Sequence, residues 1–183
     1  MKTFLAVVGV IAILGAAGGL ILAWSGAYNV AATTPEGGIV DNFLGKVADK
    51  SALRHSAGIQ APPLNDPAQI QLGFEHYQEM CVTCHGAPGV KASEIGMGLN
   101  PAPPDLVDSA KELSPARIYW IVHNGIKMTG MPAFGPTHEQ REEWAIVAFV
   151  KQLPQITPEK YRGMVQAAVA GGEHHEEPAA PKQ

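Results

Sequence analysis

Two cysteines and a histidine stand together in the segment Cys81-Val82-Thr83-Cys84-His85. Thiols two residues apart can add to the two vinyl groups on one edge of a porphyrin, and a histidine directly after them then lies under the iron. The spacing therefore predicts one covalently attached haem c, with Cys81 and Cys84 bonded to the porphyrin and His85 as the proximal iron ligand. A single motif of this kind indicates a single haem.

A zinc site and a redox dithiol are the other common uses of such a cysteine pair. Structural zinc needs four ligands, usually from a second cysteine or histidine pair, and the chain has only these two cysteines. A thioredoxin-like pair requires a βαβ pattern nearby, and the sequence shows none. Both alternatives are therefore less well supported than haem attachment.

A second group of candidate ligands lies in the segment 127–135, which reads KMTGMPAFG. A methionine sulfur on the far haem face would keep the iron six-coordinate and raise its potential. We favour Met131 as this distal ligand, because Pro132 biases it toward an extended backbone and Gly130 permits close approach to the porphyrin. Met128 is the alternative methionine, and either one could instead fill a gap in the haem pocket.

The remaining histidines are weaker candidates for ligation. His123 and His138 could make a bis-histidine site, but each lies at the end of a predicted helix, where a surface residue is the simpler interpretation. His76 is expected to be exposed on the helix before the cysteines. His174 and His175 are adjacent in a polar tail, where two ligands on a disordered segment would bind a metal weakly.

The N-terminal part of the chain predicts a membrane anchor. Residues 3–24 carry no charge, and as a helix they would span about 33 Å, enough for the hydrocarbon core of a bilayer. The alternative is a cleaved signal peptide, whose apolar region is usually shorter. Lys2 before the run places the N-terminus in the cytoplasm, and Trp24 and Tyr28 are expected at the outer interface.

Between the anchor and the domain, residues 25–65 read as a linker with a possible amphipathic helix over 40–55. This helix could lie on the membrane, pack on a partner subunit or serve as a solvated connector. The compact domain is predicted to span 66–153, followed by a short helix over 154–170 and a disordered tail over 171–183.

Helix signals divide the compact domain. Asp66 and Pro67 begin a helix that runs into the cysteine motif, and Ser114 and Pro115 begin a second, which ends at 124. A capping box over 137–140 is expected to open a third helix that ends before Pro154. The glycine- and proline-rich stretch 86–108 is predicted as loop.

These features together resemble class I cytochrome c over about half of the chain. Gly73, Tyr77 and Cys81 match the Gly-x3-aromatic-x3-Cys pattern of that family, and the segment 148–150 is similar to the helix that crosses it, with Phe149 against Gly73. The resemblance implies an all-α, class I cytochrome c fold with three main helices around one haem, preceded here by an N-terminal transmembrane helix.

The resemblance also extends to the surroundings of the iron. The segment 104–106 is similar to the Pro-Asn-Leu of the family, which implies that the Pro104 carbonyl accepts a hydrogen bond from Nδ1 of His85. The segment 131–135 resembles the methionine loop of small bacterial and photosynthetic cytochromes c. Aromatic residues such as Tyr119, Trp120 and Phe134 could pack the haem, although ordinary core packing explains them equally well.

The membrane run and linker resemble bacterial membrane-anchored monohaem cytochromes. This implies a single-pass protein of the bacterial inner membrane whose haem domain is periplasmic. It would transfer single electrons in a respiratory or related chain, as a subunit or tethered shuttle of a larger redox complex, and would not itself be an enzyme. The alternatives are the cytochrome subunit of a periplasmic dehydrogenase and a five-coordinate haem enzyme or sensor.

Charge restricts the partners that this chain could bind. The net charge is −4 and the pI about 5.9, so nothing indicates binding to nucleic acid. The domain over 66–153 has six basic and ten acidic residues, which argues against a strongly basic docking face. We expect redox donor and acceptor proteins in or at the membrane to meet an exposed haem edge through apolar residues, helped by the tether.

Overall fold

The computed structural model describes residues 1–34 and 38–172, and the chain divides into two compact units, Met1–Pro35 and Glu36–Gln183. Most of the tail predicted to be disordered, 171–183, lies outside the described residues, and so do His174 and His175.

The first unit contains the helix α1 (Lys2–Ser25), which has no buried residue. It ends at Gly26, whose left-handed backbone, with φ of 69°, is the usual way for a helix to stop. The length and apolarity of α1 are sufficient to cross a membrane, and a signal sequence at an N-terminus would share both properties.

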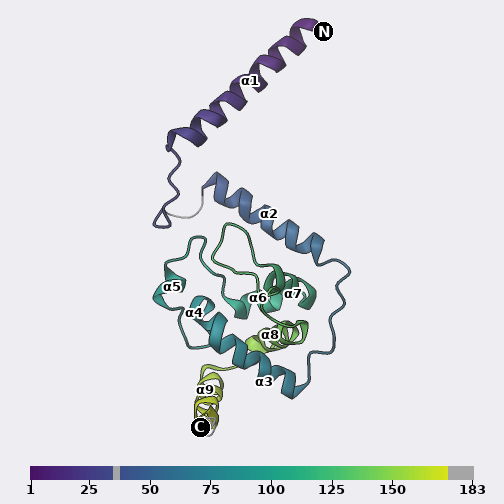
Figure 1. Cartoon of the computed structure of the whole chain (residues 1–183), viewed down its shortest axis with the longest axis vertical. Helices are drawn as coiled ribbons and strands as arrows, with labels where there is room; N and C mark the ends of the chain where they lie inside the picture. The colour runs from purple at the N-terminus through teal and green to yellow at the C-terminus, as the bar shows by residue number, and fades with distance from the viewer. Residues whose placement is uncertain (35–37, 173–183) are drawn as a thin grey trace, which may run out of the picture. The chain divides into compact units, whose positions relative to one another are not determined.

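The second unit is built from helices and loops (Figure 1). In chain order these are α2 (Ile39–His55), α3 (Pro67–His76), the π-turn η1 (Tyr77–Cys81), α4 (Val82–His85), α5 (Glu94–Met97), α6 (Leu106–Glu112), α7 (Pro115–Asn124), α8 (Gln140–Gln152), the 3-10 turn η2 (Leu153–Gln155) and α9 (Pro158–Gly172). Within the described ranges there is no strand, only an isolated bridge between Ala87 and Val90. The predicted all-α class is confirmed.

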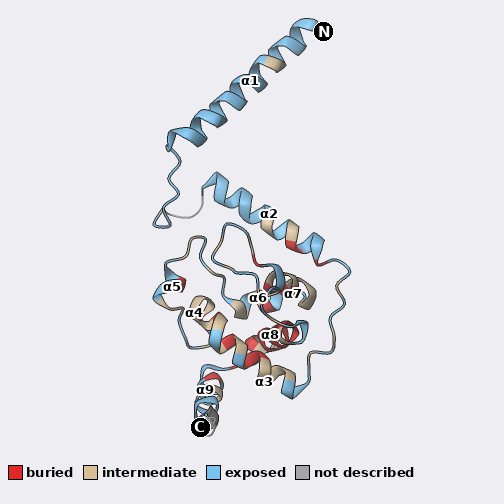
Figure 2. Ribbon diagram, in the orientation of Figure 1, coloured by how far each residue is buried: buried red, intermediate tan, exposed pale blue. Residues whose placement is uncertain are grey.

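The crossing of α3 and α8 forms the centre of the second unit. At Gly73 the two backbones approach so closely that an added Cβ would lie 1.9 Å from the Ala145 carbonyl oxygen and 3.0 Å from Cβ of Phe149. Only glycine fits there without moving a helix. Every residue of α8 from Glu143 to Val150 is buried, as the red segment in Figure 2 shows.

An aromatic cluster surrounds this crossing and includes the C-terminal helix. The Phe149 ring lies 5.4 Å from Phe74 and 5.1 Å from Tyr77. From α9, Tyr161 packs edge-on against Phe74 at 6.0 Å, is 1% exposed, and donates its hydroxyl hydrogen to the side-chain oxygen of Gln78. The helix α9 is therefore part of the core and not an appendage.

The helix α2 packs against α7 near its C-terminal end. The Arg117 guanidinium donates to the Asp49 carboxylate at 2.7 Å, and the His55 and Trp120 rings stack at 5.6 Å. Ala52, on the same helix, is 2% exposed. Trp120 therefore contacts α2, whichever other groups it packs.

Two local expectations were wrong, and capping explains both. The stretch 86–108 contains α5 and the start of α6, because Ser93 and Asp105 each accept a backbone N–H and so begin a helix. The helix α8 begins at Gln140 with Glu139 and Glu142 as its capping box. The Thr137 hydroxyl donates instead to the Phe134 carbonyl, which leaves 137–139 outside the helix.

Candidate functional site

The two cysteines lie where α3 passes through the π-turn η1 into the short helix α4. The Val82 N–H donates to the Tyr77 carbonyl, an i to i+5 bond that shifts the helical register just before Cys84. Cys81 is buried, Cys84 is half-buried, and neither forms a disulfide. Burial, reinforced by the neighbouring Cys84, raises the pKa of the Cys81 thiol to about 12, so this thiol is protonated at neutral pH.

The imidazole of His85 is oriented by the backbone of another segment. Its Nδ1 donates to the Pro104 carbonyl oxygen at 2.9 Å, the contact that the family resemblance implied. Burial lowers the pKa of His85, partly offset by the Pro104 carbonyl and the Asp105 charge. With a neutral ring and the proton on Nδ1, the lone pair of Nε2 is available to a metal.

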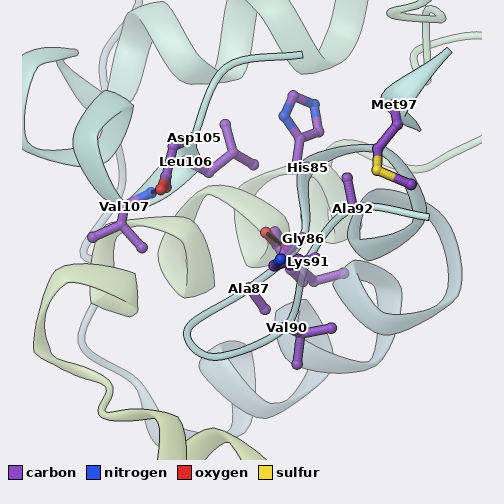
Figure 3. Close-up of a pocket in the computed structure, with 11 residues that line it drawn as sticks. His85, Gly86, Ala87, Val90, Lys91, Ala92, Met97, Asp105, Leu106 and Val107 are labelled. Atoms are coloured by element: carbon purple, nitrogen blue, oxygen red, sulfur yellow. Dashed lines mark hydrogen bonds between the residues drawn. The ribbon is translucent and has the colours of Figure 1, made fainter. Parts of the chain in front are cut away.

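A cavity of about 380 Å³ lies beside this histidine (Figure 3). Its lining comes from the start of η1, the end of α4, the turn that follows it, the end of α5 and the start of α6, and includes His85, Lys91, Met97 and Leu106. In Figure 3 the His85 ring projects from its segment with Met97 on one side and Leu106 on the other. Met97 also lines this cavity, although it is 69% exposed. The sequence did not predict this position, because nothing in its Gly-Met-Gly setting distinguishes it from other surface methionines.

Tight contacts fix the segment that carries the histidine. The Tyr77 hydroxyl donates to the Gly86 carbonyl at 2.6 Å. Gly86 has φ of +65°, and an added Cβ would lie 2.5 Å from the Val90 carbonyl oxygen. On the other side, a Cβ on Gly96 would lie 2.8 Å from Cα of Cys84, so α5 sits directly against the cysteine motif.

The two candidate methionines differ sharply in their surroundings. Met131 is half-buried, its N–H donates to Thr129 Oγ1 at 3.1 Å, and its carbonyl accepts from the Ile126 N–H at 3.1 Å. Met128 is 85% exposed and has φ of +61°. The loop therefore holds Met131 by both backbone groups and leaves Met128 in solvent.

The loop 126–136 that carries Met131 is folded back on the end of α7 and is called the methionine strap below. Phe134 N–H donates to the Val122 carbonyl and Gly135 N–H to the His123 carbonyl, each at 3.0 Å. Gly125 has φ of +63°, and an added Cβ would lie 2.7 Å from the Met131 carbonyl oxygen.

The strap also touches the segment that follows the cysteine motif. A Cβ on Gly130 would lie 2.7 Å from the Leu99 methyl groups. The space that glycine leaves at this position is therefore used by Leu99. This contact joins the methionine strap to the part of the chain that carries α5.

The histidines considered as alternative ligands contact other side chains of the same domain. His123 Nδ1 lies 2.9 Å and 3.1 Å from the two carboxylate oxygens of Glu143, which is 1% exposed. The His138 ring lies 5.4 Å from His76, edge to face. The His76 side chain is 16% exposed and lies 3.9 Å from Glu142, so it is more buried than the sequence suggested.

The aromatic residues near the strap divide between core and surface. Tyr119 is buried and stacks on Trp144 at 4.2 Å, so it is part of the core. Phe134 is half-buried and packs edge-on against His138.

The donor set fits an iron porphyrin better than a zinc ion. It consists of two thiols on one helical turn and one imidazole oriented for ligation, and it can supply two covalent links and one axial ligand. Within residues 1–34 and 38–172, no three histidine, cysteine or acidic side chains come together as a metal site would require.

Comparison with known proteins adds one finding. A family model described as "Cytochrome C oxidase, cbb3-type, subunit III" matches residues 68–150. No curated protein matches the chain. The matched segment is 83 of the 183 residues and contains the cysteine motif, Pro104 and Met131, but excludes α1, α2 and α9.

Proposed function

Residues 68–150 are a class I c-type cytochrome domain with covalently bound haem c, and from this premise we propose that the chain is a membrane-tethered carrier of single electrons. The observation that carries the proposal is the hydrogen bond from His85 Nδ1 to the Pro104 carbonyl at 2.9 Å. It presents a neutral imidazole directly after two free thiols, which is the arrangement that an attached iron porphyrin requires.

We assign the residues as follows. Cys81 and Cys84 form the two thioether links, and His85 Nε2 is the proximal ligand. Pro104 holds the ring and the tautomer of His85. When bound, the haem supplies an iron that can gain or lose one electron, and the protein sets its potential through ligands and burial.

Met131 is the proposed distal ligand. Its half-buried position and the two backbone hydrogen bonds that hold it support this choice over Met128, which is 85% exposed. With a protein ligand on each face the iron would have no open position, so the chain would pass electrons and make no bonds in a substrate. This favours a carrier over a five-coordinate enzyme or sensor.

Tethering is proposed from α1. This helix is long and apolar enough to cross a membrane, and Lys2 at its start favours a cytoplasmic N-terminus with the haem domain in the periplasm. The partners are then redox proteins in or at the bacterial inner membrane, one as electron donor and one as acceptor.

The family match also bears on the complex to which the chain belongs. The name of the matching family model describes a subunit of an oxidase, which supports membership of a respiratory complex of that type, as a subunit or a tethered shuttle. The cytochrome subunit of a periplasmic dehydrogenase is the alternative. Purification of the native protein in mild detergent separates these, because a subunit co-migrates with its own complex.

The experiment for the carrier function uses the full chain produced with its haem. A potentiometric titration should follow a single one-electron curve, and the reduced protein should bind carbon monoxide only slowly, because a protein ligand blocks the iron. Rapid carbon monoxide binding without denaturant would overturn the carrier function in favour of a five-coordinate haem protein.

A further inference from the structure

One face of α2 carries large apolar side chains that nothing in the second unit covers. They are between 41% and 91% exposed, and all lie in the N-terminal half of the helix: Ile39, Val40, Phe43, Leu44 and Val47. A contiguous group of exposed apolar side chains on one helix marks a contact surface more often than scattered single ones do. This group is called the outer face of α2 below.

The outer face points away from the haem domain. The helix contacts α7 through the side that bears Ala52, which is 2% exposed. Phe43 precedes Ala52 by nine residues, and at 100° per residue this places the two side chains about 180° apart around the helix axis. The domain therefore holds α2 by its small-residue side and leaves the apolar side outward.

The charges of α2 are also segregated around the helix. Lys50 and Arg54 follow Phe43 and Val47 at helical spacing, so they continue the outer face toward the C-terminal end, with Lys46 at its edge. All three cations are exposed.

The acidic residues of α2 lie elsewhere and are engaged. Asp41 accepts from the Gly38 N–H at 3.1 Å, and Asp49 accepts from Arg117 at 2.7 Å. The outer face thus combines apolar side chains with cations and carries no acid. This combination fits a bilayer surface with anionic headgroups, into which apolar side chains insert while lysine and arginine reach the phosphates.

Chain length keeps α2 near any membrane that α1 crosses. Thirteen residues, 26–38, separate the end of α1 from the start of α2. Even fully extended, they span no more than about 45 Å. The local concentration of lipid around α2 is therefore high, and a modest affinity is enough for contact.

We propose that the outer face of α2 binds the lipid surface of the membrane that holds α1, with anionic headgroups as partners of Lys46, Lys50 and Arg54. This inference rests on the membrane anchor of the proposed function. Because Asp49 and His55 fasten α2 to Arg117 and Trp120 of α7, the lipid contact also orients the haem domain relative to the bilayer.

The test uses the full haem-containing chain in nanodiscs of phosphatidylcholine and phosphatidylglycerol. A nitroxide label is attached to one introduced cysteine, at Val47→Cys on the outer face, at Glu112→Cys as an exposed control on α6, or at Ile13→Cys within α1. Collision rates with oxygen, which prefers lipid, and with a water-soluble nickel chelate then report the surroundings of each label. Unchanged wild-type protein, whose own cysteines are in thioether links, provides the labelling blank.

The label at position 47 should collide with the nickel chelate several-fold less often than the label at position 112. Nanodiscs of phosphatidylcholine alone, or the Lys46→Glu/Lys50→Glu double variant, should reduce this protection. Equal accessibility at 47 and 112 would overturn the proposal, and protection that arises only beside a co-purifying protein would overturn it in favour of a protein partner. The label at position 13 distinguishes failure of this proposal from failure of the membrane anchor. A lipid signal at position 13 without protection at position 47 would show that α1 is in the membrane and that α2 does not contact it.

Discussion

At the level of single residues, the environment of His85 decides what its imidazole can do. The Pro104 carbonyl occupies Nδ1 at 2.9 Å, and burial lowers the pKa of the ring, so the neutral form with a free Nε2 prevails near pH 7. A histidine on an ordinary surface helix would lack both constraints. The cysteine spacing and the proline could be read from the sequence, whereas the burial that shifts the pKa depends on segments distant in the chain.

Replacing Met131 with alanine should remove the sulfur-to-ferric-iron band at the red edge of the visible spectrum and lower the reduction potential, because a thioether favours ferrous iron. Met128→Ala is the matched control, since that side chain is 85% exposed and should leave both unchanged. Spectra and potentiometric titration of the two variants check this. Loss of the band in the Met128 variant alone would show that the ligand was wrongly chosen.

Ionisation of Tyr161 should lower the stability of the protein at alkaline pH. Burial raises the pKa of its phenol to about 12, whereas an unfolded tyrosine ionises at about 10. Between these values the unfolded chain binds fewer protons than the folded one, so the free energy of unfolding falls as pH rises.

Tyr161→Phe should therefore flatten part of this alkaline decline while costing about 1 kcal/mol at neutral pH through the lost hydrogen bond to Gln78. Denaturant unfolding at a series of pH values from neutral to strongly alkaline measures both effects. An unchanged slope would mean that the phenol ionises as readily in the folded protein as in the unfolded chain.

At the level of elements, the crossing of α3 and α8 sets the geometry on which the cysteine motif depends. The periodic apolar face of α3 and the glycine at the crossing were evident from the sequence. Other features were not evident. The helix α8 begins at Gln140 and not at the predicted position, because Glu139 and Glu142 cap it. The packing of α9 depends on the contact between Tyr161 and Phe74. Local propensity does not show which of two neighbouring residues will cap a helix. It also does not show which surface a short terminal helix will cover.

Gly73→Ala should destabilise the domain by about 3 kcal/mol, because the new methyl group would overlap the Ala145 carbonyl and force the helices apart. Gly163→Ala in α9 is the control: nothing lies within 4 Å of its added Cβ, and better helix propensity should stabilise by about 0.5–1 kcal/mol. Thermal unfolding of the two variants gives the comparison. Similar effects of the two changes would contradict the close crossing.

Gly125→Ala tests how the methionine strap is held. Alanine at φ of +63° costs about 1–2 kcal/mol and would also press on the Met131 carbonyl. The variant should keep its covalent haem but lose part of the sulfur-to-iron band, most visibly on warming. If the band is as strong and as heat-resistant as in the wild type, the end of α7 does not position the ligand.

At the level of the whole molecule, the chain combines a cytochrome c domain with elements that the family model does not cover, namely α1, α2 and α9. The domain provides the redox chemistry. The apolar helix and the outer face of α2 are proposed to decide where that chemistry takes place, and α9 completes the core. The motif and the fold class could be predicted from sequence, but the side from which α2 is held required the structure, because the domain contacts the side that bears Ala52 and leaves the more apolar side exposed.

The central claim is that this chain carries one haem bound covalently through Cys81 and Cys84. The direct measurement is the intact mass of the mature protein after denaturation, followed by the mass of the peptide that contains 81–85. The prediction is a mass equal to the polypeptide plus one haem, located on that peptide, and a haem-free polypeptide when both cysteines are replaced with alanine. An unmodified peptide in the mature wild-type protein, or haem that separates from it on denaturation, would contradict the claim.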